Sequence, residues 1–288
     1  MKNKLLLFKA VSVLCAAVVL LSGCSLFGNT GAKVSSSSSS QKATSSEKKA
    51  PRSTKGDGIY AIANVIKMTY RSQYTDKEMP YCLILPDDYD PNEDWPVLLY
   101  LHGAGELGTD NETPIHVMLE YMYRYCKSFM QKMIVVCPQT DEFWTTHDEK
   151  MQGNNEANLK TVKHLMDDLM EKYAFDPKRI YVMGISMGGI ATWEMLATYP
   201  KYFAAGVPIC GSGDVSQARR LVNMPIWAYH STDDPTVDFR GTDDMYKEIK
   251  RLGGEKIKFT VLEDAGHAAW DYAMGDTEML EWLLEQHK

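Results

Sequence analysis

The chain has 288 residues and a formal net charge of −7 at pH 7, and its lysines and arginines form no stripe of the kind that follows a nucleic-acid backbone. Nucleic acid is therefore excluded as an expected partner. With the N-terminal segments described below set aside, about 230 residues remain, enough for one α/β domain with a sizeable core.

The N-terminus has the pattern of an export signal. Two early lysines precede an apolar run over residues 5–21, which leads through Ser-Gly to Cys24. A basic start, an apolar stretch and small residues before a cut site are typical of a secretory signal. The Leu-Ser-Gly-Cys ending resembles a bacterial lipobox. That resemblance implies a signal peptide over residues 1–23, a lipid on Cys24 and a position in the cell envelope, on the outer side of a bacterial membrane; the alternative is an ordinary signal peptide with an incidental cysteine.

A polar segment follows the cysteine. It contains six consecutive serines, Ser35–Ser40, and stays polar to about Lys55. Such a segment has almost nothing apolar to bury, so residues 24–57 are expected to form a flexible tether that holds a folded domain off the membrane. The folded domain is expected over residues 58–288.

The remaining sequence alternates between predicted strands and helices. Strands are predicted at residues 81–85, 96–101, 133–137, 179–183, 205–209, 225–229 and 257–262. Helices are predicted at residues 155–173, 190–199, 243–252 and 277–286. Several of the strands are continuous apolar runs, as expected of strands covered on both faces. The alternation predicts a mostly parallel sheet with helices on both of its faces.

Reactive residue types follow four of these strands, where an α/β sheet forms its sites. The strongest signal is Gly184-Ile185-Ser186-Met187-Gly188, a G-x-S-x-G pattern that follows a strand and opens a helix. Its glycines suit a sharp, crowded turn, and the serine would project at a helix N-terminus, where negative charge is favoured. Without partners, Ser186 would be only a small residue in a tight turn.

A nucleophilic serine needs a histidine as base and a carboxylate to orient that histidine. His267 follows the last strand and lies downstream of the serine and the candidate acids, in the order Ser-Asp-His. The acid should follow the strand that ends at Tyr229, where Asp233 and Asp234 are adjacent and spacing alone does not separate them. The other histidines lie in a helix, in loops, before the acid or at the C-terminus: His102, His116, His147, His164, His230 and His287.

From about Met79 onward, the chain resembles the esterase branch of the α/β-hydrolases, which includes polyhydroxybutyrate-depolymerase-like, feruloyl and acetylxylan esterases. The resemblance rests on "PVLLYLHGAGELGTDN", "RIYVMGISMGGIATWEM", "PIWAYHSTDDPTV" and "GHAAWDY". It implies the α/β-hydrolase fold. The family's acid segment, His-Gly-x-x-Asp-Pro-x-Val, implies that Asp234 is the acid; this chain departs from it with Ser231 in place of glycine.

The resemblance also implies the rest of the site. The oxyanion hole would be made by the backbone N–H groups of Met187 and Ala104. Trp144, which could instead only shield the core, and Glu106 are expected at the rim as substrate-binding residues. Trp270 completes the family's Gly-His-x-x-Trp motif and is expected at the same rim.

Four cysteines fall within the predicted domain: Cys82, Cys126, Cys137 and Cys210. Exported proteins often pair their cysteines. These four are scattered, mostly inside apolar runs, so buried free thiols are at least as plausible as disulfides. No spacing suggests zinc, and neither a metal nor a cofactor is expected.

The sequence therefore predicts a lipid-anchored serine carboxylesterase that works through an acyl-enzyme. The resemblance and the export signal together suggest plant cell-wall esters, feruloyl or acetyl groups on xylan, with the polysaccharide as partner. One rival is a serine peptidase like prolyl oligopeptidase, which shares the triad but carries a propeller-sized N-terminal domain that this chain lacks. The other is a non-catalytic binding lipoprotein on a hydrolase scaffold, which would not need an intact triad.

Overall fold

The structure is a computed structural model that describes residues 58–145 and 155–288. The expected signal peptide, Cys24 and the serine-rich tether lie outside the described residues, as does His147. Among the described residues, no helix is long and apolar enough to cross a bilayer.

In the described part of the chain, an eight-stranded sheet forms the centre, in the order β1-β2-β4-β3-β5-β6-β7-β8. The strands are β1 (Asn64–Arg71), β2 (Glu78–Leu85), β3 (Trp95–Leu101), β4 (Ile134–Pro138), β5 (Phe175–Ile185), β6 (Ala205–Ile209), β7 (Ile226–Ser231) and β8 (Ile257–Leu262). Strands β1, β2 and β4 pair antiparallel, and the remaining pairs are parallel. This arrangement confirms the expected mostly parallel α/β sheet.

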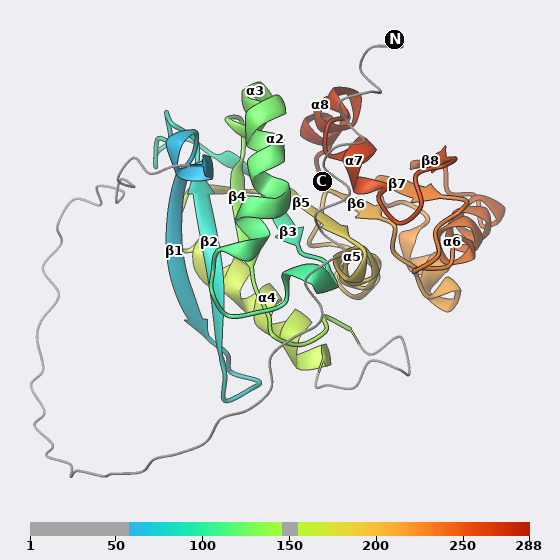
Figure 1. Cartoon of the computed structure of the whole chain (residues 1–288), viewed down its shortest axis with the longest axis horizontal. Coiled ribbons are helices and arrows are strands. Elements are labelled where there is room, and N and C mark those ends of the chain that lie inside the picture. Colours follow the sequence, from blue (N-terminus) through green and yellow to red (C-terminus); the bar gives the residue numbers. More distant parts are fainter. Residues whose placement is uncertain (1–57, 146–154) are drawn as a thin grey trace, which may run out of the picture. The chain divides into compact units, whose positions relative to one another are not determined.

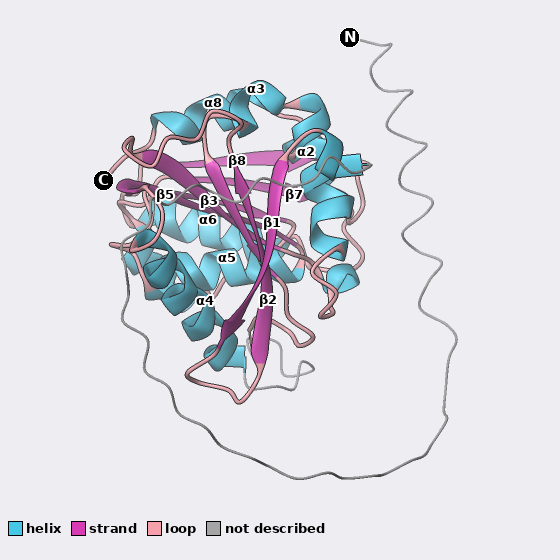
Figure 2. Ribbon diagram, turned by 90° about the vertical axis from the view of Figure 1, so that its left-hand side faces the viewer, coloured by secondary structure: helices cyan, strands magenta, loops and turns pink. Residues whose placement is uncertain are grey.

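Helices cover both faces of the sheet (Figure 1). The helices are α2 (Glu120–Tyr125), α3 (Lys127–Met130), α4 (Asn155–Met170), α5 (Met187–Thr198), α6 (Arg240–Arg251), α7 (Trp270–Ala273) and α8 (Thr277–Glu285). Figure 2 shows α3 and α8 on one face of the sheet and α4, α5 and α6 on the other. Four short turns of helix join them: η1 (Gly58–Ala61), η2 (Ala104–Glu106), η3 (Ile115–Leu119) and η4 (Val215–Leu221).

The core explains why the central elements read as apolar runs. Six consecutive residues of β3 are buried, and so is nearly every residue of α5. A helix that is apolar all round is a buried one. Helix α5, which directly follows the candidate nucleophile, is thereby held between β5, β6 and the elements outside them. This packing fixes the N-terminus of α5 relative to the ends of the strands.

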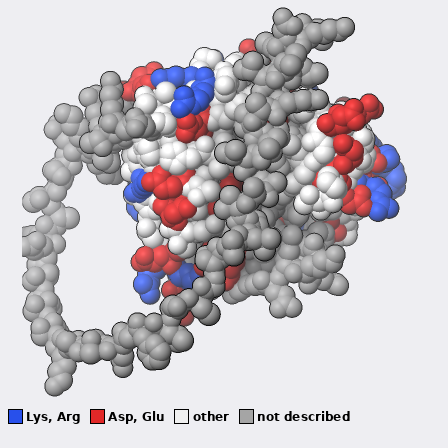
Figure 3. Space-filling model, viewed as in Figure 1, with Lys and Arg blue, Asp and Glu red and all other residues white. Residues whose placement is uncertain are grey.

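Strand β1 was not predicted from the sequence. Only Val65 and Tyr70 of its eight residues are buried, because it lies at the edge of the sheet and pairs with β2 alone. The four cysteines are all buried and unpaired; Cys82 and Cys137 face each other in register across β2 and β4. On the face in Figure 3, the acidic and basic side chains of the described residues lie in small mixed groups.

Candidate active site

The turn between β5 and α5 holds Ser186 in a strained conformation. Its φ is +52° and its ψ −118°, values that residues with a Cβ rarely adopt and that concentrate at functional sites. The neighbouring glycines are required by close packing. A Cβ on Gly188 would lie 1.9 Å from the Leu101 carbonyl oxygen, and one on Gly184 would lie 2.3 Å from that of Gly188. The G-x-S-x-G pattern therefore follows from the crowding of this turn against β3.

Three loops bring Ser186, His267 and Asp234 into one hydrogen-bonded chain. The serine Oγ lies 2.8 Å from His267 Nε2, and His267 Nδ1 lies 2.7 Å from Asp234 Oδ2. The carboxylate can only accept, so Nδ1 carries the hydrogen and Nε2 is left to accept the serine proton. The Asp234 side chain is fully buried, whereas that of His267 is 20% exposed. The geometry is that of a nucleophile, its base and the group that orients the base.

The Asp234 carboxylate has a full set of donors. Its Oδ1 accepts the backbone N–H groups of Thr236, at 2.8 Å, and Val237, at 3.0 Å. Its Oδ2 accepts from His267 and lies 3.2 Å from His230 Nε2. A buried carboxylate without donors would carry a large desolvation cost, and these four contacts offset that cost.

His230 is a member of this network that the sequence did not predict. Its Nε2 faces two acceptors, Asp234 Oδ2 and, at 3.1 Å, the Val237 carbonyl oxygen, so Nε2 must carry a hydrogen. Its Nδ1 lies 2.8 Å from Thr242 Oγ1, whose single hydrogen also has the Gly211 carbonyl oxygen within reach at 2.7 Å. Burial lowers the pKa of His230, which favours the neutral ring. A neutral His230 donates a hydrogen bond to the Asp234 carboxylate and adds no second positive charge beside His267.

The structure separates the two adjacent aspartates. Asp233 points away from the triad: its Oδ1 accepts the Ser231 hydroxyl and, at 2.9 Å, the backbone N–H of Gly266. These bonds, the Ser231 hydroxyl first, lower the pKa of Asp233. Gly266 directly precedes His267, so Asp233 fixes the loop that carries the base while Asp234 contacts the base itself.

The expected oxyanion donors lie at the first positions of two short helical segments. Met187 opens α5 and Ala104 opens η2, and the N–H groups of a first helical turn have no acceptor within their own helix. The loop of Ala104 packs against the residue before the nucleophile, because a Cβ on Gly103 would lie 3.3 Å from Ile185 Cγ1. This contact places the loop of Ala104 next to the turn that carries Ser186.

A buried histidine braces that loop. His102 Nδ1 donates to the Gly103 carbonyl oxygen at 2.8 Å, and His102 Nε2 accepts the Thr140 N–H at 3.1 Å. Burial lowers the pKa of His102 to about 4, so the ring is neutral and this tautomer is fixed. Trp144 is fully buried on the same ring, with its Nε1 donating to the His102 carbonyl oxygen at 3.0 Å. Trp144 therefore shields the core, which was the alternative to its expected role as a substrate-binding residue.

The structure corrects the expected position of Glu106, which does not line the rim. Its side chain turns back under η2, where Oε2 accepts the Gly103 N–H at 2.7 Å, and the residue is only 4% exposed. Burial raises its pKa to about 8. The 3-10 turn makes this possible because it brings residue 106 over residue 103, a contact that no spacing rule for substrate-binding residues would predict. Trp270, in contrast, lies at the site, with its ring edge-on to His267 at 5.1 Å between centroids.

Cys210 lies behind the triad. Within the described residues, its Sγ forms a group of possible metal ligands with Asp234 and His267, whose ligand atoms lie within 4.8 Å of one another. Burial raises the pKa of this thiol, so it is neutral. Asp234 and His267 already bond each other. The group is therefore part of the packing around the triad, and no pattern in the sequence indicated that Cys210 would lie near the triad.

Several known proteins are similar to this chain. Residues 72–272, more than half of the chain, match the Esterase family model, described as "Putative esterase". A bifunctional acetylxylan esterase/xylanase of Neocallimastix patriciarum is 25% identical over 165 residues, which are 57% of this chain and 23% of that protein. An acetylxylan esterase A of Emericella nidulans is 34% identical over 82 residues, 27% of each chain. The chain thus spans about a quarter of the length of these curated relatives.

Solved structures are similar over more of the chain. The crystal structure of a thermostable esterase has a TM-score of 0.70 and 33% identity, over 78% of this chain and 63% of that one. A feruloyl esterase module from Clostridium thermocellum, complexed with sinapinate, has a TM-score of 0.58 and 17% identity, over 83% and 94% of the two chains. At that identity the second similarity shows the fold alone.

Proposed function

The chain belongs to the Esterase family, and from this premise we propose that it is a serine carboxylesterase of the α/β-hydrolase fold. The observation that carries the proposal is the continuous chain from Ser186 Oγ through His267 to Asp234, with contacts of 2.8 and 2.7 Å. A serine that is strained, half-buried and bonded to an oriented histidine is what nucleophilic catalysis requires.

In the proposed reaction, Ser186 Oγ attacks the ester carbonyl carbon while His267 Nε2 takes the hydroxyl proton. The carbonyl oxygen becomes an oxyanion that the N–H groups of Met187 and Ala104 stabilise. Asp234 holds the imidazole tautomer and stabilises the imidazolium. His267 then gives its proton to the leaving alcohol, and an acyl-enzyme remains on Ser186.

Water completes the cycle. His267 Nε2 removes a proton from a water molecule that attacks the acyl carbon. The same two N–H groups stabilise the oxyanion that forms in this second step. Its collapse returns the proton to Ser186 Oγ and releases the carboxylic acid. The steps use side chains, backbone N–H groups and water.

The substrate we propose is a plant cell-wall ester, an acetyl or feruloyl group on xylan. The supporting observation is that two of the relatives bear the name acetylxylan esterase and a structural neighbour is a feruloyl esterase module. We further propose that a lipid on Cys24 anchors the protein at the outer side of a bacterial membrane, with residues 24–57 as tether and residues 58–288 as catalytic domain. Support for the anchor is the lipobox-like sequence alone.

The test is an ester panel with a matched variant. The purified protein and its Ser186→Ala variant are assayed against p-nitrophenyl acetate, methyl ferulate, acetylated xylan and a proline-containing chromogenic peptide. Hydrolysis of the esters that falls by several orders of magnitude in the variant is expected. Cleavage of the peptide instead would point to a peptidase, and full ester hydrolysis by the variant would refute the assignment of the nucleophile. Intact-mass measurement of membrane-extracted protein tests the anchor, which an unmodified Cys24 would contradict.

A further inference from the structure

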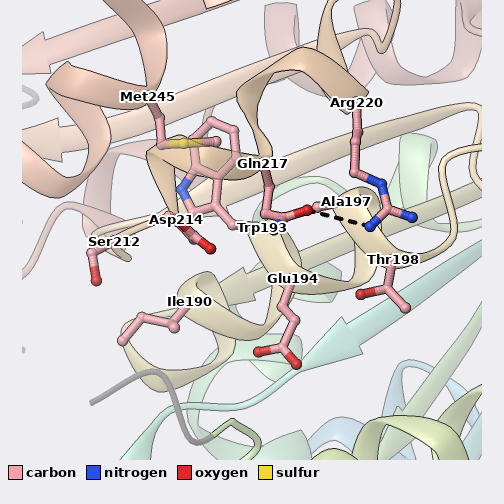
Figure 4. Close-up of a pocket in the computed structure, with 11 residues that line it drawn as sticks. Ile190, Trp193, Glu194, Ala197, Thr198, Ser212, Asp214, Gln217, Arg220 and Met245 are labelled. Atoms are coloured by element: carbon pink, nitrogen blue, oxygen red, sulfur yellow. Dashed lines mark hydrogen bonds between the residues drawn. The ribbon is translucent and has the colours of Figure 1, made fainter. Parts of the chain in front are cut away.

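A polar cavity lies along helix α5, on the side where η4 and α6 pack (Figure 4). Its volume is about 380 Å³, within the range of small-ligand sites. The lining residues come from α5, the loop after β6, η4 and α6, and none of them belongs to the triad. Neither the proposed reaction nor the packing of the core accounts for it.

One end of the cavity lies at the first turn of α5, the helix that directly follows the nucleophile in the sequence. Ile190, at one end, is one helical turn beyond Ser186 and donates its backbone N–H to the Ser186 carbonyl oxygen at 3.0 Å. Ser212, also at this end, comes two residues after Cys210, whose Sγ lies within 4.8 Å of the ligand atoms of Asp234 and His267. From Ile190 to Thr198 the helix rises by roughly 12 Å, at 1.5 Å per residue. A ligand that lies in the cavity could therefore extend from the reacting ester along α5.

The apolar lining residues form a closed floor. Trp193 and Met245 are 2% and 1% exposed, so they offer almost no surface to a ligand. The groups that remain accessible are polar and come from two sides. Glu194 extends from α5, while Gln217 and Arg220 of η4 lie above it, joined by a hydrogen bond of 3.3 Å (Figure 4). The wall thus presents hydrogen-bonding groups over an apolar base.

These groups select a class of ligand. The wall combines acceptors, the carboxylates of Glu194 and Asp214, with donors, the Arg220 guanidinium and the Gln217 amide. Asp214 also caps η4 by accepting the Ser216 N–H, and the Gln217 amide donates to Ser216 Oγ. An acyl chain or a phenolic ring would desolvate these groups without satisfying them. An anion would meet two carboxylates for one guanidinium. A neutral chain with many hydroxyl groups both donates and accepts, and so matches the whole wall.

We propose that this cavity binds glycosyl units of an ester-bearing polysaccharide, adjacent to the ester group that lies at Ser186. The inference rests on the proposed esterase function for its substrate class, but it concerns a separate set of residues. The polysaccharide chain would follow α5, while the ester it carries reaches the triad. Selectivity for polymeric over small esters would then come from the cavity and not from the catalytic residues.

Two arginines on η4 provide a matched pair for the test. Arg220 lines the cavity, whereas Arg219, the preceding residue and also exposed, does not. The first experiment measures binding of a linear, unesterified xylo-oligosaccharide to the Ser186→Ala protein by calorimetry. Adding Arg220→Ala should weaken binding roughly three- to tenfold, the effect of one lost hydrogen bond, and adding Arg219→Ala should leave it unchanged. Glu194→Gln, which keeps the side-chain shape, provides a second variant.

The second experiment uses the active protein. The ratio of kcat/KM for acetylated xylan to kcat/KM for p-nitrophenyl acetate should fall in Arg220→Ala by the same factor as binding. Absence of oligosaccharide binding, an equal loss in both arginine variants, or an unchanged ratio would each overturn the proposal. A failure of the esterase function would show differently, as absent hydrolysis of every ester, while the calorimetric comparison in the Ser186→Ala protein would still report on the cavity.

Discussion

Glu106 is predicted to make the stability of the protein fall as the pH rises. The carboxyl group is buried below the loop of Ala104, and burial raises its pKa from 4.5 to about 8. In the unfolded chain the same group ionises at its ordinary pKa. Between these two values the folded protein therefore binds one more proton than the unfolded chain does, and the free energy of unfolding must decrease with increasing pH.

The size of this effect follows from the two pKa values. Each pH unit between 4.5 and about 8 removes about 1.4 kcal/mol, so the full loss is about 5 kcal/mol. It is complete just above pH 8. Of the total, about 3 kcal/mol is lost between pH 6 and pH 9. Below pH 4.5 the group is protonated in both states and contributes no pH dependence.

Glu106→Gln isolates this contribution. Glutamine has the shape of the protonated carboxyl group, retains an oxygen for the Gly103 N–H and does not titrate. The free energy of unfolding, measured in urea at pH 6 and pH 9, should fall by about 3 kcal/mol more in the natural protein than in the variant. Comparing two pH values cancels the intrinsic cost of the substitution. Equal pH dependence of the two proteins would refute the reasoning that the folded state holds Glu106 protonated.

Three further predictions concern the site and the turn that carries it. Gly188→Ala should lower the free energy of unfolding by about 3 kcal/mol or more, because its Cβ would lie 1.9 Å from a backbone oxygen. Gly105 has open space around it, so Gly105→Ala should change the free energy of unfolding by less than about 0.5 kcal/mol. Denaturant unfolding measures both. Asp234→Asn should lower kcat by about 10³- to 10⁴-fold through loss of the histidine tautomer, and Asp233→Asn by less than about tenfold. His230→Leu should lower kcat/KM by about tenfold or more through loss of a hydrogen bond to a charged group, and His230→Gln, which can place an N–H near the same point, should restore most of it.

Each of these predictions has a result that would contradict it. Equal stability of the two glycine variants would mean that the turn relaxes around a methyl group. A larger kinetic effect at Asp233 than at Asp234 would reverse the assignment of the acid. Equal losses in His230→Leu and His230→Gln would reduce the histidine to a packing residue, because a packing role would not depend on the N–H.

The fold was largely predictable because its central strands are apolar on both faces. Strands β3 and β4 and helix α5 are buried almost throughout, and continuous apolar runs carry that information in the sequence. Strand β1 carries less of this information, since its exposed residues are lysine, threonine and arginine. Its place in the sheet depends on pairing with β2, a long-range contact that the local pattern does not encode.

Some residues of the site could likewise be predicted from the sequence, and others could not. A turn motif identifies Ser186, and the chain order identifies His267. Both could therefore be predicted from the sequence alone. The contacts of Glu106 and His230 depend on how the backbone curls after a strand: a 3-10 turn folds Glu106 back onto Gly103, and the loop to Val237 closes over His230. A glutamate and a histidine at these positions are both compatible with a location at the rim. Only the path of the backbone shows that Glu106 and His230 are buried instead.

The most direct test of the central claim is covalent labelling of Ser186. The purified full-length protein is treated with a fluorophosphonate probe, and the labelled residue is located by peptide mass mapping. An activated nucleophile should be labelled at Ser186 within minutes, and the label should be lost in Ser186→Ala and strongly slowed in His267→Ala. A protein that stays unlabelled while folded, or that is labelled at another serine, would contradict the proposal that this triad performs ester hydrolysis.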